Sequence, residues 1–127
     1  MSDNEYQQAS PSAQAGLRRW LQRVRPRRVL EVGAGVGTLT RVILDGAPQA
    51  ALRFVEDSDL CLSILYRDVA VTEAQRVHDG DVPQSGPYDF VVIDGGTRTT
   101  AYYEALSPRA VVFVEGGRRD QRAALER

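Results

Sequence analysis

The stretch that decides the fold reads VLEVGAGVGT and runs from Val29 to Thr38. Its first half is a short apolar run of the kind found in buried β-strands, interrupted only by Glu31. Its second half has glycine at every other position, namely Gly33, Gly35 and Gly37. Such glycines let the backbone turn sharply and approach a ligand, and the first N–H groups of a following helix point at the same place. The stretch therefore predicts a strand, a tight turn and a helix beside a ligand.

A helix is predicted before this strand. Ser10-Pro11 offers a capping side chain followed by proline at the first helical position. Leu17, Trp20, Leu21 and Val24 then recur at helical spacing. We expect this Leu/Trp stripe to pack against the rest of the protein.

Strands and helices continue to alternate after the glycine turn. Further strands are predicted at 51–55, 76–78, 88–94 and 110–114, and further helices at 38–44, 60–65, 99–106 and 118–127. Residues 69–75 have no clear pattern. The alternation predicts an α/β fold with an open, mostly parallel sheet of about five strands and helices on both faces.

The composition fits one ordinary globular domain. The 127 residues are 43% hydrophobic, and a formal net charge of -1 lacks the positive field of a general nucleic-acid binder. No apolar run approaches the ~20 residues that span a bilayer, and the polar start does not resemble a secretory signal, so we expect a cytoplasmic protein without a membrane partner. Arginine without lysine indicates GC-rich bacterial coding. Cys61 is the only cysteine, which excludes an internal disulfide and the usual zinc clusters. We expect a flexible segment at 1–9 and the domain at 10–127.

Acidic residues stand at the carboxyl ends of the predicted strands. Glu31, Glu56, Asp94 and Glu115 each end or follow a strand, and 79–81 reads Asp-Gly-Asp. In open parallel sheets, ligands bind beyond these ends, where the winding of the chain reverses. A purely structural sheet has no need of acids there.

The glycine series departs from the dinucleotide fingerprint Gly-x-Gly-x-x-Gly, because Gly37 comes one position early and Thr38 takes its place. Glu31-x-Gly33-x-Gly35-x-Gly37 instead resembles the first motif of class I S-adenosylmethionine-dependent methyltransferases. The resemblance extends over about residues 13 to 120: an acid ends the second strand, Gly80-Asp81 follows the third, and an apolar strand ending in Asp94 resembles the fourth motif. The family implies a Rossmann-like fold.

The resemblance implies a site for S-adenosylmethionine and assigns residues to it. Glu56 matches the acid that holds the ribose diol, and Asp81 matches the acid that contacts adenine. The implied cofactor-binding residues are Glu31, Gly33, Gly35, Gly37, Glu56, Asp57, Gly80, Asp81 and Asp94. Taken singly, each also has a structural explanation, such as a turn without a ligand for the glycines, a helix cap for Glu56 and an ordinary loop aspartate for Asp81.

The resemblance also suggests the chemistry. Methyl transfer requires alignment of donor and acceptor and deprotonation of the acceptor, and Asp94 is the candidate general base. Its alternative is a cap for the following helix. Tyr102 and Tyr103 are candidates for an acceptor pocket, although one of them is expected in the core. Some small-molecule O-methyltransferases bind a divalent cation here, but their later Asp-Asn pair is absent, so we assign no metal ligand and leave metal dependence open.

The expected function is methyl transfer to a small-molecule acceptor, with oxygen favoured as the acceptor atom. Two alternatives remain. One is an oxidoreductase that uses NAD or another nucleotide, and the other is a methyltransferase-like module that binds cofactor without catalysis.

The strand at 110–114 leads to a prediction about assembly. It is apolar throughout and contains neither proline nor charge, and the family's usual strands six and seven are missing after it. We expect its edge to be bare and two copies of the chain to associate there as a homodimer.

Overall fold

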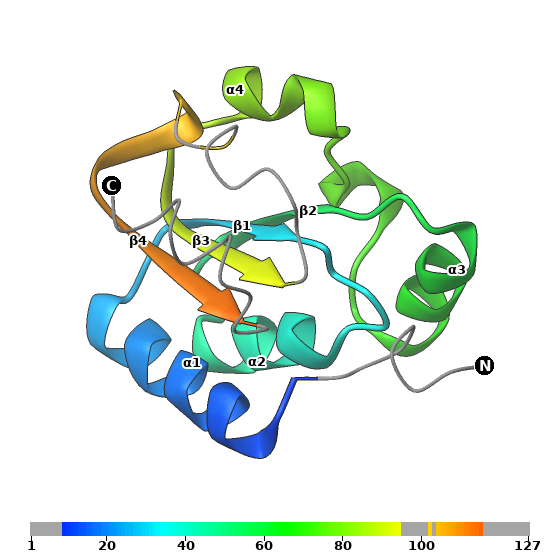
Figure 1. Ribbon diagram of the computed structural model, residues 1–127, viewed down its shortest axis with the longest axis horizontal. Helices are drawn as coiled ribbons and strands as arrows, with labels where there is room; N and C mark the ends of the chain where they lie inside the picture. Colours follow the sequence, from blue (N-terminus) through cyan, green and yellow to red (C-terminus); the bar gives the residue numbers. More distant parts are fainter. Residues whose placement is uncertain (1–8, 95–101, 103, 116–127) are drawn as a thin grey trace.

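The computed structural model describes residues 9–94, 102 and 104–115, and it confirms the predicted α/β fold (Figure 1). In chain order the elements are α1 (Pro11–Val24), β1 (Arg28–Val32), α2 (Thr38–Gly46), β2 (Ala51–Val55), α3 (Asp59–Asp68), the 3-10 turns η1 (Glu73–Gln75) and η2 (Asp79–Asp81), α4 (Val82–Ser85), β3 (Tyr88–Asp94) and β4 (Leu106–Glu115). The helix predicted at 118–127 lies outside the described residues. None of the described helices is both long and apolar enough to cross a membrane.

The sheet has four parallel strands in the order β2-β1-β3-β4. The chain moves outward from β1 to β2 and then returns to the other side of β1 to form β3. The winding therefore reverses between β1 and β3, and a ligand site is expected at the carboxyl ends of these two strands.

The third predicted strand, at 76–78, is the difference from the expected five. Among the described residues this segment makes one isolated parallel bridge, between Phe54 and Arg76, together with a hydrogen bond from the Val77 N–H to the Phe54 carbonyl at 2.8 Å. The segment lies where a strand was expected, beside β2. The segment is too short to form a ladder of paired strands, because η1 ends at Gln75 and η2 begins at Asp79.

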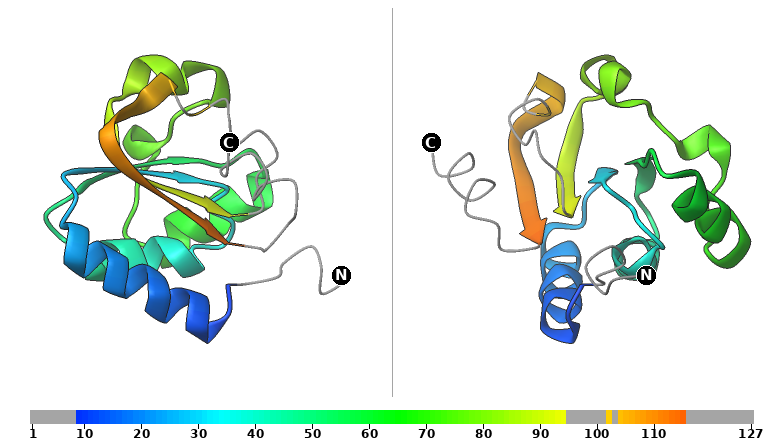
Figure 2. Two further views of the ribbon diagram at one scale, coloured as in Figure 1. Left: turned by 60° about the vertical axis from the view of Figure 1, so that its left-hand side comes forward. Right: turned by 45° about the vertical axis from the view of Figure 1, so that its right-hand side comes forward.

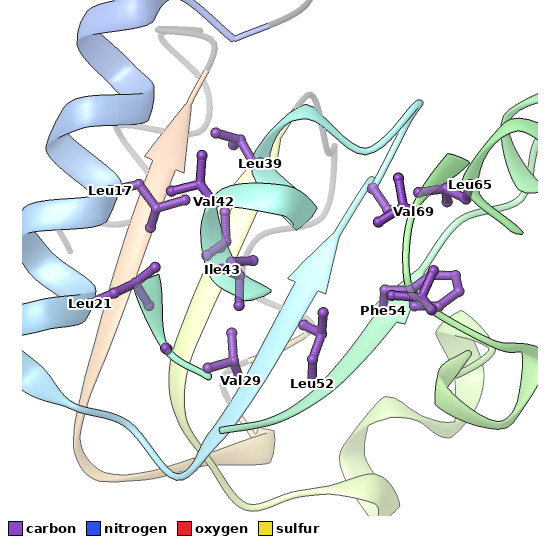
Figure 3. Packing of buried hydrophobic residues seen from close by; sticks show 14 of the residues in the cluster. Leu17, Leu21, Val29, Leu39, Val42, Ile43, Leu52, Phe54, Leu65 and Val69 are labelled. Carbon is purple, nitrogen blue, oxygen red and sulfur yellow. The ribbon is translucent and has the colours of Figure 1, made fainter. Parts of the chain in front are cut away.

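Each face of the sheet packs against its own hydrophobic cluster. One cluster joins Val29 of β1 and Phe54 of β2 to α1, α2 and α3 (Figure 3). The other joins Leu30 of β1 and Val91 of β3 to Val82 of α4 and to the segment before β4. Three helices therefore cover one face, and the short α4 lies on the other (Figure 2).

Helix α1 begins as predicted, because the Ser10 hydroxyl accepts a hydrogen bond from the Ala13 N–H at 3.1 Å. The Leu/Trp stripe is only partly correct. Leu17 and Leu21 are fully buried, whereas Trp20 is 46% exposed. Trp20 lies at the border of the apolar stripe. The Arg23 guanidinium lies over its ring, with 5.8 Å between the guanidinium carbon Cζ and the ring centroid.

Strand β4 differs from the prediction in length and shape. It begins at Leu106, inside the helix predicted at 99–106, of which only Tyr102, Glu104, Ala105 and Leu106 are described. Its register against β3 shifts between the pairs Tyr88/Leu106 and Phe90/Val111. The extra residues include Pro108 and Arg109, whose φ is 69°. A bulge and a proline therefore interrupt the first part of β4, which the prediction for 110–114 did not include.

The predicted homodimer has its basis in the second half of β4. Val111 to Val114 are half-buried, and among the described residues β4 pairs only with β3. We expect the wild-type chain to sediment as a dimer at micromolar concentration and Val112→Lys to sediment as a monomer, because a charged side chain blunts an edge strand. A wild-type monomer, or a dimer that persists in Val112→Lys, would count against pairing through this strand.

Candidate functional site

The glycine turn after β1 combines two kinds of glycine. All three have positive φ, 79° for Gly33, 58° for Gly35 and 98° for Gly37. A Cβ on Gly33 would lie 2.3 Å from the Asp94 carbonyl oxygen, and one on Gly37 would lie 2.5 Å from a Val69 methyl group. A Cβ on Gly35 would meet nothing within 4 Å. Gly33 and Gly37 are therefore required by the packing of the protein itself, whereas Gly35 presents bare backbone to open space.

The carboxylate of Glu56 holds this turn from the side of β2. Its Oε1 accepts a hydrogen bond from the Gly35 N–H at 2.7 Å, and its Oε2 accepts from the N–H groups of Asp57 at 3.0 Å and Ser58 at 2.9 Å. Ser58 is the N-cap of α3, with its hydroxyl accepting from the Cys61 N–H. Glu56 thus fixes the turn and the entry to α3 together, and a carboxylate with about four acceptor sites retains capacity for about one further donor.

Glu31 lies behind the turn. The residue is fully buried, and its Oε1 accepts a hydrogen bond from the Thr40 hydroxyl of α2 at 2.5 Å. Its Oε2 is buried without a hydrogen-bond partner among the described residues. The pKa of Glu31 is raised from its ordinary 4.5 to about 8. Burial is the largest cause and the charges of Asp94 and Glu56 add to it, while the Thr40 hydrogen bond opposes it. Glu31 therefore keeps its proton near pH 7 and has no surface exposed beside the turn.

Thr40 is a residue that the sequence interpretation missed. It is the second fully buried polar residue in the described part of the chain. A threonine in the first turn of a helix usually has a local explanation. The informative signal was the combination of an acid inside a buried strand with a hydroxyl on the helix that packs against that strand.

The third group of predicted site residues lies on η2. Gly80 and Asp81 are exposed, and a Cβ on Gly80 would meet nothing within 4 Å. The neighbouring Asp79 accepts a hydrogen bond from the buried Tyr102 hydroxyl at 2.6 Å. Tyr102 is therefore a core residue that ties this loop to the segment before β4, a contact that sequence spacing did not indicate. Tyr103 lies outside the described residues.

Asp94 ends β3 beside the glycine turn and is half-exposed. In the sheet it pairs in register with Glu115 at the end of β4. Asp57, also predicted to bind cofactor, is exposed and donates its backbone N–H to Glu56. Within the described ranges, no three His, Cys, Asp or Glu residues are grouped so that they could hold a metal ion.

A groove of about 680 Å³ lies elsewhere, between α1, α2 and α3. Its lining includes Arg18, Arg41, Asp45 and Asp68, but neither Glu56 nor Asp94. Its polar groups also bind one another: Arg18 pairs with Asp45, and Arg41 donates to the Asp68 carbonyl at 3.1 Å. The groove therefore does not bring the predicted site residues together. At the carboxyl edge of the sheet, Gly35 contacts Glu56 and Gly33 lies against the Asp94 carbonyl.

No protein-family model matches the chain, and no curated protein matches its sequence. Solved structures do match its fold. A Staphylococcus aureus protein provisionally designated a caffeoyl-CoA O-methyltransferase superposes with a TM-score of 0.73 at 14% identity, over 87% of this chain and 60% of that one. A Podospora anserina methyltransferase bound to SAH superposes with a TM-score of 0.70 at 13% identity, over 84% of this chain and 53% of that one. The O-methyltransferase TomG from Streptomyces achromogenes, bound to SAM, superposes with a TM-score of 0.64 at 19% identity, over 84% of this chain and 56% of that one. The chain thus has the Rossmann-like fold of these enzymes and spans 60% or less of the length of each.

The burial of Glu31 predicts how stability depends on pH. The folded protein keeps a proton on Glu31 up to about pH 8, whereas the unfolded chain releases it near 4.5, so the wild type loses stability as pH rises through this window. Glu31→Gln cannot titrate. We expect its free energy of unfolding, relative to the wild type, to rise by roughly 3 to 5 kcal/mol between pH 5 and pH 8.5.

Urea unfolding at a series of pH values measures this difference, with the exposed Asp59→Asn on α3 as the control. A constant difference between Glu31→Gln and the wild type across the window would show that Glu31 is ionised in the folded protein at all these pH values.

Proposed function

We propose that this chain is a methyltransferase domain that binds S-adenosylmethionine at the carboxyl ends of β1, β2 and β3 and methylates a small molecule, with oxygen as the acceptor atom. The observation that carries the proposal is the pairing of the open backbone at Gly35 with the Glu56 carboxylate, 2.7 Å from N to Oε1, where the turn after β1 meets the carboxyl end of β2. The shared fold with structures bound to SAM and SAH supports it.

The residues present fit this cofactor. Gly35 leaves room for a ligand to approach the backbone, and Glu56 has acceptor capacity for a ribose hydroxyl beside its three backbone donors. Gly80 and Asp81 are exposed on η2, where they are available to the adenine ring. The carboxylates of Glu56 and Asp94 suit a positively charged ligand. When bound, the sulfonium supplies an already activated methyl group.

The protein's own contribution is then alignment and proton removal. Glu56 orients the cofactor from one side of the turn, while Asp94 lies on the other side, at the end of β3. We assign Asp94 as the general base that accepts the proton of the acceptor hydroxyl as the methyl group is transferred.

The oxidoreductase alternative fits less well. In the dinucleotide fingerprint the third glycine allows close packing of helix and strand. That glycine would stand at position 38, one residue after Gly37, where this chain has Thr38. Gly37 instead caps α2 and accommodates the side chains of Val69 and Leu65.

Cofactor binding is tested by calorimetry with S-adenosylhomocysteine and with NAD. We expect the wild type to bind the first and not the second, and Gly35→Val to lose binding, because a side chain there fills the space that the ligand needs. Gly16→Val is the matched control, since a Cβ on Gly16 meets only the tip of Arg19 at 3.9 Å. Circular dichroism checks that both variants fold. Tight binding by folded Gly35→Val would remove the turn from the proposed site.

A second prediction separates an enzyme from a binding module. Asp94→Asn keeps the size of the side chain but cannot accept a proton, so turnover should fall by ~100-fold or more while cofactor affinity stays within a few fold. Methyl transfer from labelled cofactor to a panel of phenols and other hydroxyl compounds supplies the readout. Equal turnover in both proteins would leave Asp94 with a structural role only.

A further inference from the structure

Strand β4 carries opposite charges at the two ends of an apolar edge. Its segment 109–115 reads Arg-Ala-Val-Val-Phe-Val-Glu, so five apolar residues separate Arg109 from Glu115. Arg109 is exposed and Glu115 is half-exposed, and neither forms an ion pair with another residue that the structure describes. Within the described ranges, β4 pairs with β3 on one side and with no strand on the other. This free edge therefore offers backbone N–H and C=O groups together with two uncompensated charges.

The charges make the free edge complementary to a second copy of itself. Val112 stands three residues from Arg109 and three residues from Glu115. In an antiparallel pair with its twofold axis at Val112, each Arg109 lies at the level of the partner's Glu115, and this contact occurs twice. Between these ends, Val111 lies opposite the partner's Phe113. The pair thus combines matched charges with apolar cross-strand contacts, and both stabilise neighbouring strands.

Both faces of the sheet continue through such a pair. Val111 and Phe113 pack against the cluster that includes α1, whereas Val112 and Val114 pack against the cluster on the other face. Residues directly opposite in an antiparallel pair point to the same face of the sheet. Each cluster therefore meets the equivalent cluster of the partner, and no apolar side chain of this segment has to turn toward water.

A parallel pair of the same two strands does not fit. It brings each Arg109 beside the partner's Arg109 and each Glu115 beside the partner's Glu115, so like charges face each other at both ends. Pro108 has no N–H and lies in the bulged part of β4, so regular pairing does not extend far beyond Arg109. The segment that is available for pairing is thus also the segment that is complementary to itself.

We propose that two copies of this chain pair antiparallel through β4, with the twofold axis at Val112, and that each copy brings its Arg109 to the candidate site of the other. Asp94 pairs in register with Glu115, so two acids from neighbouring strands stand at the carboxyl edge of the sheet. The partner's Arg109 lies next to Glu115, one strand away from Asp94, and supplies a positive charge beside these acids. The pairing adds an orientation, a register and a shared arginine to the homodimer expected from the bare edge, and it does not depend on the proposed function.

Exchanging the two charges tests the orientation and the register. At low ionic strength, we expect Arg109→Glu and Glu115→Arg each to raise the dimer Kd by about tenfold, because each puts like charges together at both ends of the pair. Arg109→Glu combined with Glu115→Arg in one chain restores opposite charges, and its Kd should return to within about threefold of the wild type. Sedimentation over a series of protein concentrations measures these constants, and circular dichroism checks that each variant folds.

Cross-linking locates the twofold axis independently. Cys61 is the only cysteine, and Cys61→Ser removes it. In that background Val112→Cys should form a disulfide between copies, because residues directly opposite in an antiparallel pair have Cα atoms about 4.5–5.5 Å apart. Ala110→Cys is the matched control in the same strand and on the same face. Its two copies lie roughly 13 Å apart along the strand, so they should not cross-link.

A further control separates the ion pairs from a change in net charge. Asp59→Arg changes the net charge as much as Glu115→Arg does, but it lies exposed on α3, which follows the opposite edge strand β2 (Figure 2). We expect it to leave the dimer Kd unchanged. The proposal is overturned by a wild-type monomer, by single variants that dimerise as tightly as the wild type, by a double variant no tighter than the single ones, or by equal cross-linking at positions 110 and 112.

Discussion

The site depends on a close backbone approach between the ends of β1 and β3. These strands pair in register up to Val32 and Ile93. Gly33, the residue that follows β1, lies directly against the Asp94 carbonyl. A side chain at position 33 would have to push the two strand ends apart. Because Gly33 is bare, the turn can leave the sheet at the point where the winding reverses, and its N–H still bonds to the Val55 carbonyl at 2.9 Å. The glycine turn is therefore held by both neighbouring strands.

The same arrangement makes Glu31 unfavourable for stability when it is ionised. A carboxyl group inside an apolar sheet is costly when ionised, and folding responds by keeping it protonated at neutral pH. A methionine or leucine there would pack without that penalty.

Elements that depend on apolar composition alone were predictable from the sequence. Features that depend also on how the elements pack against one another were not. Apolar runs located β1, β2 and β3 correctly, because a strand covered on both faces has little freedom in composition. Trp20 has helical spacing with Leu17, but spacing alone does not say how wide the buried stripe is. The start of β4 was missed because Ser107-Pro108-Arg109 does not resemble a strand, and only pairing with β3 carries the strand through the bulge.

The site shows the same division. The sequence predicted which acids stand at strand ends, but not whether each one faces solvent or protein, because that depends on which helix covers each face. Glu31 points to the face covered by α2, where Thr40 meets it, while Glu56 follows its strand and turns back to the glycine turn. The sequence left two alternatives for Glu56, a helix cap and a contact with a ligand. In the structure one carboxylate bonds to the turn and to the entry of α3, so the positions of the turn and of α3 depend on the same side chain.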